Sequence, residues 1–407
     1  NITYIPWVEI KQKAGDKILL SLSKHASCVI LDDYPTYTPN KILRAAPKIL
    51  KLRVDAVDSN GILPMMWAEK EFTTAYSFRK YMQKSLVDAL QTIPAMNSMD
   101  GVGDNLSLTS DDLEFLREET GLEATPLEWL SRVAEGGIVG DRAMADFPID
   151  HSVPAVKETI GGIDEARMRL QKFLNYKLNK YSIDRNNPDT PAVSGLSPWL
   201  HFGHISSFEI IEKVFAKENW SVDSLNHEDT GKGTRSGWWG TSESASSFLD
   251  QIITWRELGF NFAYNRIDHA TIETIPNWAK ISMTEHINDD RTLYSLEELE
   301  QAETHDEIWN ASQRELLRTG QMHNYMRMLW GKKILEWSPD PETAAERMIY
   351  INDKWALDGR DPNSYTGIFW VLGRHDRAWG PERPIFGKVR YMSSESAMRK
   401  LKLKNYL

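Results

Sequence analysis

From about Pro126 to its end, the chain repeats apolar residues at the three- and four-residue spacing of amphipathic helices. The pattern is clear in Ile163–Tyr181 and Ser207–Ala216, and it continues through the long segment Trp309–Trp337. So sustained a helical pattern predicts a large all-α domain, which we place at residues 156–407.

The part of the chain before it has a different pattern. Ser27–Leu31, Leu52–Val57 and Ile62–Met66 are short apolar runs, and helical patterns such as Lys41–Leu50 lie between and after them. Alternating strands and helices are typical of a parallel sheet, and only about three strands are visible. We therefore predict a small, Rossmann-like α/β domain with a shortened sheet at residues 1–95.

Residues 96–155 are expected to link the two domains. The first of them, 96–110, are rich in Gly, Ser, Asn and Asp, which favour turns and loops. Helical patterns follow, so we predict a linker that contains helices.

Composition excludes several kinds of site. Cys28 is the only cysteine, which rules out an internal disulfide, a four-cysteine iron–sulfur cluster and a cysteine zinc site, and we predict no metal site. No apolar run approaches the length of about 18 residues that a membrane span needs. No charged-then-apolar leader follows Asn1, so we expect a cytoplasmic protein, associated with the nucleoid if the source is prokaryotic, and no membrane partner.

The formal net charge of -10 limits how the chain can bind nucleic acid. A protein that binds DNA by charge alone is usually basic, so any contact here must come from a local patch. Basic residues cluster near the C-terminal end, at Lys388, Arg390, Arg399, Lys400, Lys402 and Lys404. On charge alone, a solvated helix face with a basic tail explains this cluster equally well.

Tryptophan is over-represented, with 15 residues, most of which follow Trp199. Trp330 and Trp337 would share one face of a helix about two turns apart, and Trp309 lies on a preceding segment that could fold back. A row of indoles would let an electron cross the protein in short steps. An aromatic core stripe explains the same spacing, and spacing alone favours that explanation.

Three polar segments of the helical part can also carry chemistry. Ser194–Gly203 places Ser and Gly before a helix, which suits a phosphate at a helix N-terminus, although an ordinary helix cap is the commoner explanation. Glu257 lies in an apolar helix, where a carboxylate is either paired in a salt bridge or used in the function. The loop Asp358–Asn363 is either a capped turn or a means of directing a carboxylate and an amide into a cavity.

Together these segments resemble the photolyase/cryptochrome family, and within it the class II cyclobutane pyrimidine dimer photolyases. The resemblance extends from about Tyr181 to Tyr406, and residues 55–58 and 61–64 are similar to the end of the family's antenna domain. The motifs occur in the family's order and spacing, namely WNASQ at 309–313, MHNYMRMLW at 322–330, KKILEW at 332–337, NDK at 352–354, DGRDPN at 358–363 and FGKVRYM at 386–392.

The resemblance implies that the helical domain binds FAD in a U shape. It implies that the FAD phosphates lie near Tyr181 and Ser194–Ser197, and that Arg327 and Asp358 form an ion pair beside the flavin ring, with Asn352 near flavin N5. The cofactor-binding residues implied in this way are Tyr181, Ser194, Gly195, Leu196, Ser197, Arg327, Asn352, Asp358 and Gly359.

The resemblance also implies roles in electron transfer and lesion binding. The photoreduction chain to the surface would consist of Trp330, Trp309 and Trp337. Glu257 would hydrogen-bond the dimer, and Met328 and Trp370 would pack against it, so that the implied catalytic residues are Glu257, Met328, Asn352 and Trp370. The residues expected to contact DNA are Arg185, Asn324, Lys388 and Arg390.

The implied enzyme is a carbon–carbon lyase that repairs UV-damaged DNA. The lesion would be flipped out of the stack, and excited reduced FAD would donate the electron that opens the cyclobutane ring and then returns. The expected partner is damaged DNA, single- or double-stranded, and the expected state is a monomer. Two alternatives stay open: a cryptochrome-like blue-light sensor without repair activity, and a nucleic-acid-binding module without photochemistry.

The chain departs from the class II pattern at several positions. Asn324 stands where class II enzymes are expected to carry Gly, and Trp355 stands where Tyr is expected. Gly237–Gly240, with the sequence GWWG, is not a class II feature. With the short first domain, these departures indicate a compact relative of class II. They argue against an antenna chromophore and leave open whether duplex or single-stranded DNA is preferred.

Overall fold

The computed structural model describes residues 2–9, 13, 15, 17–93, 107–121, 124–145 and 147–407. The chain divides into two compact units, of which the first combines Asn1–Ser59 with Pro94–Glu158 and the second combines Asn60–Ile93 with Thr159–Leu407. Residues 60–93, which the sequence pattern places with the α/β domain, thus cluster with the helical unit. Residues 96–106 of the predicted linker lie outside the described residues.

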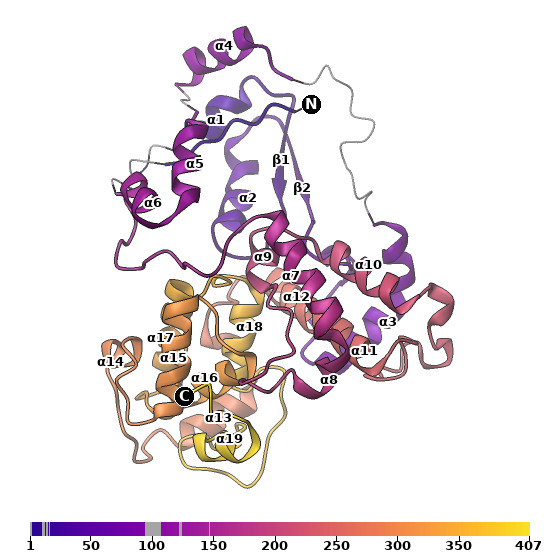
Figure 1. The fold of residues 1–407 in the computed structure, drawn as a ribbon, viewed down its shortest axis with the longest axis vertical. Helices are drawn as coiled ribbons and strands as arrows, with labels where there is room; N and C mark the ends of the chain where they lie inside the picture. Colours follow the sequence, from indigo (N-terminus) through magenta and orange to yellow (C-terminus); the bar gives the residue numbers. More distant parts are fainter. Residues whose placement is uncertain are drawn as a thin grey trace. The chain divides into compact units, whose positions relative to one another are not determined.

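The first unit contains a two-stranded parallel sheet. β1 (Cys28–Asp32) pairs with β2 (Arg53–Val57) in the register that joins Cys28 to Arg53, and α2 (Tyr37–Ile49) connects the two strands (Figure 1). The prediction of a small α/β domain together with a large helical domain is confirmed. The other helices of this unit are α1 (Ile18–Ser23), α4 (Ser110–Thr120), α5 (Leu127–Glu135) and α6 (Gly137–Met144).

The third apolar run expected to be a strand is not one. Ile62–Met66 enters the second unit as a turn that leads into a short 3-10 helix at Met65–Trp67. The backbone N–H groups of Ile62 and Leu63 donate to the two carboxylate oxygens of Glu257, at 2.6 and 3.1 Å. Because a buried side chain satisfies these amides, the segment needs no strand partner.

The second unit is built from helices around two buried clusters. One cluster joins α3, α7, α10 and α11, and the other joins α13 and α15 to α18. No helix within the described ranges is long and apolar enough to cross a membrane. The helices are α3 (Ala75–Gln91), α7 (Ile163–Tyr176), α8 (Tyr181–Asp184), α9 (Ser197–His201), α10 (Ser207–Glu218), α11 (Glu243–Leu249), α12 (Arg256–Asn265), α13 (Asn277–Glu285), α14 (Leu296–Glu300), α15 (Glu307–Thr319), α16 (Asn324–Glu336), α17 (Pro341–Trp355), α18 (Pro362–Val371) and α19 (Ser394–Lys400).

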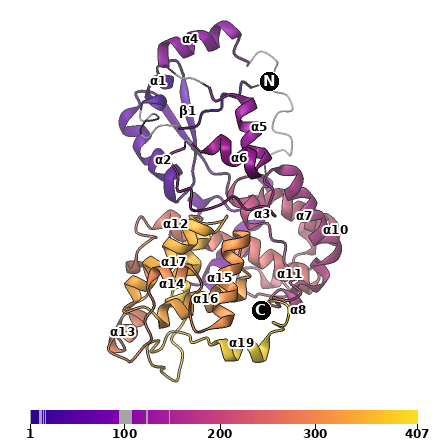
Figure 2. The same cartoon turned by 60° about the vertical axis from the view of Figure 1, so that its left-hand side comes forward.

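Helix α16 lies among α15, α17 and α18, which all pack against it. Figure 2 labels α15, α16 and α17 close together in the orange part of the chain, and Figure 1 labels α18 next to them. The residues from Leu329 to Leu335 are all buried, as expected for a helix that is covered on every side. A Cβ atom at Gly331 would lie 2.6 Å from Cγ2 of Val371, so only glycine permits the close approach of α16 and α18.

The boundaries of these helices follow from local residues. Gly320 ends α15 in the left-handed conformation, with φ of +65°, and the chain then turns back into α16. Asp306, Asp340 and Asp361 each cap the start of a helix, as side-chain acceptors for the backbone N–H groups of Trp309, Thr343 and Asn363. The turn at Gly320 is what brings Trp309 back beside Trp330.

Candidate functional site

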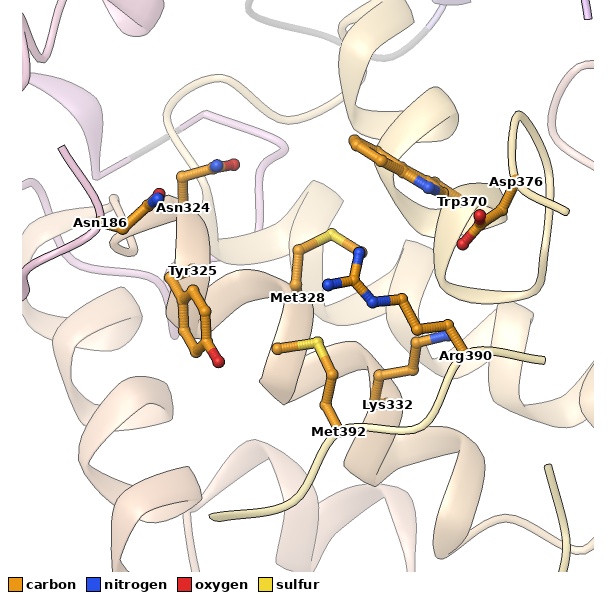
Figure 3. Close-up of a pocket in the computed structure, with 9 residues that line it drawn as sticks. All are labelled: Asn186, Asn324, Tyr325, Met328, Lys332, Trp370, Asp376, Arg390 and Met392. Carbon is orange, nitrogen blue, oxygen red and sulfur yellow. The ribbon is translucent and has the colours of Figure 1, made fainter. Parts of the chain in front are cut away.

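A cavity of about 100 Å³ lies beside α16 in the second unit (Figure 3). Its walls come from α16, from the end of α18, from the loop that follows α18 and, through Asn186, from the segment after α8. The structure brings together here four residues predicted from the sequence, namely Met328, Trp370, Asn324 and Arg390. The full lining is Asn186, Asn324, Tyr325, Met328, Lys332, Trp370, Asp376, Arg390 and Met392.

The lining combines apolar and charged groups. Figure 3 shows the thioethers of Met328 and Met392 near the Arg390 guanidinium, with Trp370 and Asp376 on one side. Thioethers and indoles offer polarizable surfaces that suit flat aromatic or heterocyclic rings. The cavity can therefore hold a planar group and neutralise a negative charge beside it.

Lys332 lies in the wall of this cavity and was not predicted as a site residue. Its side chain is buried, and its ammonium group donates to the carbonyl oxygen of Val371 at 2.5 Å, at the C-terminal end of α18. Burial lowers the pKa of Lys332 to about 7, an effect that Asp376 opposes and Arg390 reinforces. The Lys-Lys pair in KKILEW was the available signal, but no sequence rule says which of the two buried lysines lines the cavity.

Trp370 has a partner that the sequence analysis missed. The indole of Trp255 stacks on it, with ring centroids 4.7 Å apart and planes 12° apart. Trp255 is the last residue of a π-helical turn, Asp250–Trp255, that leads into α12. Such turns often occur at functional sites, because the extra residue redirects side chains.

Glu257 is buried but does not line the cavity of about 100 Å³. Its two carboxylate oxygens hold the backbone amides of Ile62 and Leu63, and Gly61 passes so close that a Cβ atom there would lie 2.9 Å from the carboxyl carbon. A buried carboxylate is tolerated when amides satisfy it in this way. The contact of Glu257 with a lesion stays a prediction.

A second group of predicted residues lies around the start of α16 and the end of α17. The guanidinium of Arg327 lies 3.2 Å from the carboxylate of Asp358. Asn352 is buried, and its amide nitrogen lies 3.4 Å from a carboxylate oxygen of Asp353. A Cβ atom at Gly359 would lie 2.8 Å from the carbonyl oxygen of Asn352, so glycine is needed where this turn packs on α17.

The remaining predicted cofactor residues lie on α8 and before α9. Tyr181 is buried, and its ring makes edge contacts with those of Phe173 and Phe248. Gly195 has φ of +66°, and the atom nearest to a Cβ atom there would be Oε1 of Gln321, at 4.0 Å. Leu196 is buried, and Ser197 is the first residue of α9. Within the described residues, the Ser194 side chain has no hydrogen-bond partner.

The three predicted indoles of the electron chain lie together. The N–H group of Trp309 donates to the carbonyl oxygen of Trp330 at 3.0 Å, and the rings of Trp309 and Trp337 are 5.4 Å apart, at 74°. The N–H group of Trp330 donates to the side-chain oxygen of Gln313 at 2.9 Å. One part of the expectation needs correction, because Trp337 is only 2% exposed and does not end the row at the surface.

The predicted DNA contacts are spread over three segments. Arg390 and Asn324 line the cavity, and the guanidinium of Arg390 lies 5.1 Å from the ring of Trp379. Lys388 pairs with Glu382 at 3.1 Å and is about half exposed. The guanidinium of Arg185 lies 5.7 Å from the ring of Tyr181.

Comparison with known proteins decides the family. No family model matches the chain. The deoxyribodipyrimidine photo-lyase of Methanothermobacter thermautotrophicus is 40% identical over 401 residues, which cover 98% of this chain and 77% of that protein. The deoxyribodipyrimidine photo-lyase of Arabidopsis thaliana is 31% identical over 416 residues, which cover 99% and 74%. The chain belongs to the deoxyribodipyrimidine photolyase family.

A solved structure supports the same fold for this photolyase-family chain. The crystal structure of a bacterial class III photolyase from Agrobacterium tumefaciens matches with a TM-score of 0.52 and 17% identity, over 88% of this chain. The chain spans 64% of the length of that protein. The expected photolyase/cryptochrome family and lyase type are confirmed at this level, while the class within the family is not.

The photolyase family implies FAD, and the described residues fit this cofactor. The Arg327–Asp358 pair offers a cation and an acceptor to the polar edge of a flavin, and the buried amide of Asn352 lies on the adjoining helix. His323 supplies an independent sign, because its Nδ1 atom is buried and has no partner in the part of the chain that the structure describes, while Nε2 lies 3.1 Å from the carbonyl oxygen of Arg185. A buried polar atom without a partner calls for a ligand atom or water.

His323 was not singled out from the sequence, although it belongs to the MHNYMRMLW motif. Burial lowers the pKa of His323, so the imidazole is neutral at pH 7 and one nitrogen can accept a hydrogen bond. Among the described residues, no group of three or more His, Cys, Asp or Glu side chains is placed to hold a metal ion.

Proposed function

We propose that this protein repairs cyclobutane pyrimidine dimers in UV-damaged DNA, using light and a bound reduced FAD. The observation that carries the proposal is the arrangement of α16. One helix supplies Met328 to the cavity, Arg327 to the ion pair with Asp358, and Trp330 to the indole row. On this proposal the lesion pocket, the cofactor site and the electron path would share helix α16.

The residues that would hold FAD are Tyr181, Ser194–Ser197, Arg327, Asn352, Asp358 and Gly359. We add His323, because its buried Nδ1 atom has no hydrogen-bond partner among the described residues. When bound, the flavin supplies the electron that opens the cyclobutane ring and takes it back. The protein's part is to orient the ring system and to exclude water. The neutral His323 would accept a hydrogen bond, and Arg327 would place a positive charge at the flavin edge.

The cavity of about 100 Å³ would receive the flipped lesion. Unstacking costs less for a damaged step than for an intact one, which favours the dimer over normal bases. Trp370 offers a stacking surface that is fixed from behind by Trp255. Arg390, in the same wall, would pair with the DNA backbone or with a carbonyl group of the lesion.

The three indoles would serve the activation of the enzyme. An oxidised flavin has to be reduced before repair begins, and Trp330, Trp309 and Trp337 offer short steps for the electron that does so. The motifs favour a compact relative of the class II enzymes, and we propose that class for this chain.

The test uses the purified protein with an oligonucleotide that contains a single cyclobutane dimer. The absorption spectrum reports bound flavin, and chromatography after blue light reports repaired oligonucleotide, with a dark sample and a Trp370→Ala variant as controls. Flavin with light-dependent repair is expected. If the protein binds flavin but shows no repair even after chemical reduction, the result would point to a light sensor. If the purified protein contains no flavin, the proposal would be overturned.

A further inference from the structure

We propose that Tyr294 and His305 form a proton-coupled exit for the indole row. They would carry the positive charge from Trp337 to the surface during light-driven reduction of the flavin. This inference rests on the proposed function, because it assumes that an oxidised flavin draws an electron through Trp330 and Trp309.

The row needs an exit because its last indole is buried. Trp337 is 2% exposed, Trp309 is fully buried and Trp330 is 3% exposed. A positive charge left on a buried indole is poorly solvated and recombines with the electron that it released. A further donor between Trp337 and water would separate the charges for longer.

Two further rings, those of Tyr294 and His305, are in contact with Trp337. The ring centroid of Tyr294 lies 5.3 Å from that of Trp337, at 71°, and the ring centroid of His305 lies 5.4 Å away, at 63°. Tyr294 is half-buried and His305 is exposed. Both come from segments outside α16, since Tyr294 precedes α14 and His305 precedes α15.

The hydrogen bonds of the Tyr294 hydroxyl prepare it to lose a proton. Its oxygen lies 2.6 Å from Nδ1 of His305 and accepts the backbone N–H group of His305 at 3.0 Å. With the neutral imidazole protonated at Nε2, Nδ1 accepts the phenolic proton along the shorter bond. The backbone N–H group stabilises the oxygen that the proton leaves.

In the proposed step, one electron and one proton leave Tyr294 for different acceptors. With a bound, photoexcited oxidised flavin as the oxidant, Trp337 would be left as a radical cation after the positive charge has moved from Trp330 through Trp309. Tyr294 gives one electron to Trp337, which becomes neutral, and one proton from Oη to Nδ1 of His305. The products are a neutral tyrosyl radical and an imidazolium in contact with solvent. An external thiol, as one-electron reductant, later restores Tyr294, and the proton returns from His305.

The test measures radicals in the illuminated holoenzyme by electron paramagnetic resonance. Wild type is expected to form a tyrosyl radical, and its rate of formation should fall in D2O. Tyr294→Phe should lose this signal and shorten the lifetime of the separated charges. His305→Phe, which keeps an aromatic ring on Trp337, should slow tyrosyl formation by about tenfold or more, since the proton acceptor is lost.

A control is Tyr350→Phe, because Tyr350 is an exposed tyrosine on α17, outside the ring cluster of Trp337. It should behave as wild type. A tyrosyl signal that persists in Tyr294→Phe, or wild type without any tyrosyl signal, would overturn the inference. Variants that lose only thermal stability would mean that the three rings serve packing alone.

A second experiment tests the relay without a bound flavin, and therefore independently of the proposed function. A photogenerated ruthenium(III) complex in solution oxidises aromatic side chains without any flavin. The Tyr294 signal should appear in wild type under these conditions and should weaken in His305→Phe. If the protein lacks flavin, the proposed function is wrong, and the ruthenium experiment alone tests the relay. Equal tyrosyl radical signals in wild type, Tyr294→Phe and His305→Phe would then exclude the relay.

Discussion

The indole of Trp255 lies parallel to the indole of Trp370, with 4.7 Å between ring centroids and 12° between planes. Trp370 lines the cavity, whereas Trp255 reaches it from the start of α12. The stack restricts the orientation of Trp370, so a residue that lines the cavity depends on one that does not.

Trp255→Ala should therefore weaken the binding of a dimer-containing oligonucleotide. An aromatic pair contributes about 0.5–1.5 kcal/mol beyond the area that it buries, which corresponds to a loss of about two- to tenfold in affinity. Fluorescence anisotropy would measure the Kd, with Trp255→Phe as the variant that keeps the stack. Equal affinity for Trp255→Ala and wild type would show that Trp370 holds its position unaided.

Trp330→Phe should block the photoreduction of bound FAD and leave repair by the chemically reduced protein largely intact. The variant also leaves the side-chain oxygen of Gln313 without its buried donor, at a cost of about 1–3 kcal/mol. Absorption during illumination and repair of the oligonucleotide are measured separately. Trp220→Phe is the control, because Trp220 loses a similar bond, to the carbonyl oxygen of Trp239, away from the row. Loss of both readouts in Trp330→Phe would indicate a role in flavin retention.

Glu257→Ala should destabilise the second unit as well as weaken repair. It leaves the buried N–H groups of Ile62 and Leu63 without acceptors, so we expect the free energy of unfolding to fall by about 2–5 kcal/mol. Glu257→Gln keeps one side-chain oxygen, so its free energy of unfolding should lie between those of wild type and Glu257→Ala. Urea unfolding reports stability, and the flavin absorbance should stay. Unchanged unfolding together with lost repair would instead favour a direct contact with the lesion.

Lys332→Met should change how stability depends on pH. Burial lowers the pKa of Lys332 from 10.5 to about 7, so between these values the unfolded chain binds a proton that the folded chain does not. The contribution of Lys332 to the free energy of unfolding is thus lowest below pH 7 and rises toward pH 10.5.

The variant lacks this titration, so its stability relative to wild type should be highest at pH 7 and below and should decline as the pH rises. Urea unfolding at a series of pH values measures the difference, which we expect to vary by a few kcal/mol. Two parallel curves would mean that the ammonium is not destabilised by burial.

Much of the site was predictable because its residues lie in contiguous motifs. Met328, Trp330 and Arg327 are neighbours in one helical segment, and Asn352 and Asp358 lie close together near the end of the next. Local spacing therefore determined which residue types share a helix, and with the family motifs it indicated the indoles and the ion pair. The prediction of a third strand was wrong. Ile62–Met66 has the apolar pattern of a strand, but the backbone N–H group of Ile62 donates to Glu257, far along the chain.

The amino-acid pattern by itself determined a helical domain and a small α/β unit before it, because helix periodicity and capping are encoded over a few neighbouring residues. Only the tertiary structure decided that Trp255 stacks on Trp370, that Lys332 is buried, and that Trp337 ends inside the protein beside Tyr294 and His305. These contacts join residues far apart in the chain. Their free energy depends on packing and on the loss of water, which no local spacing reveals.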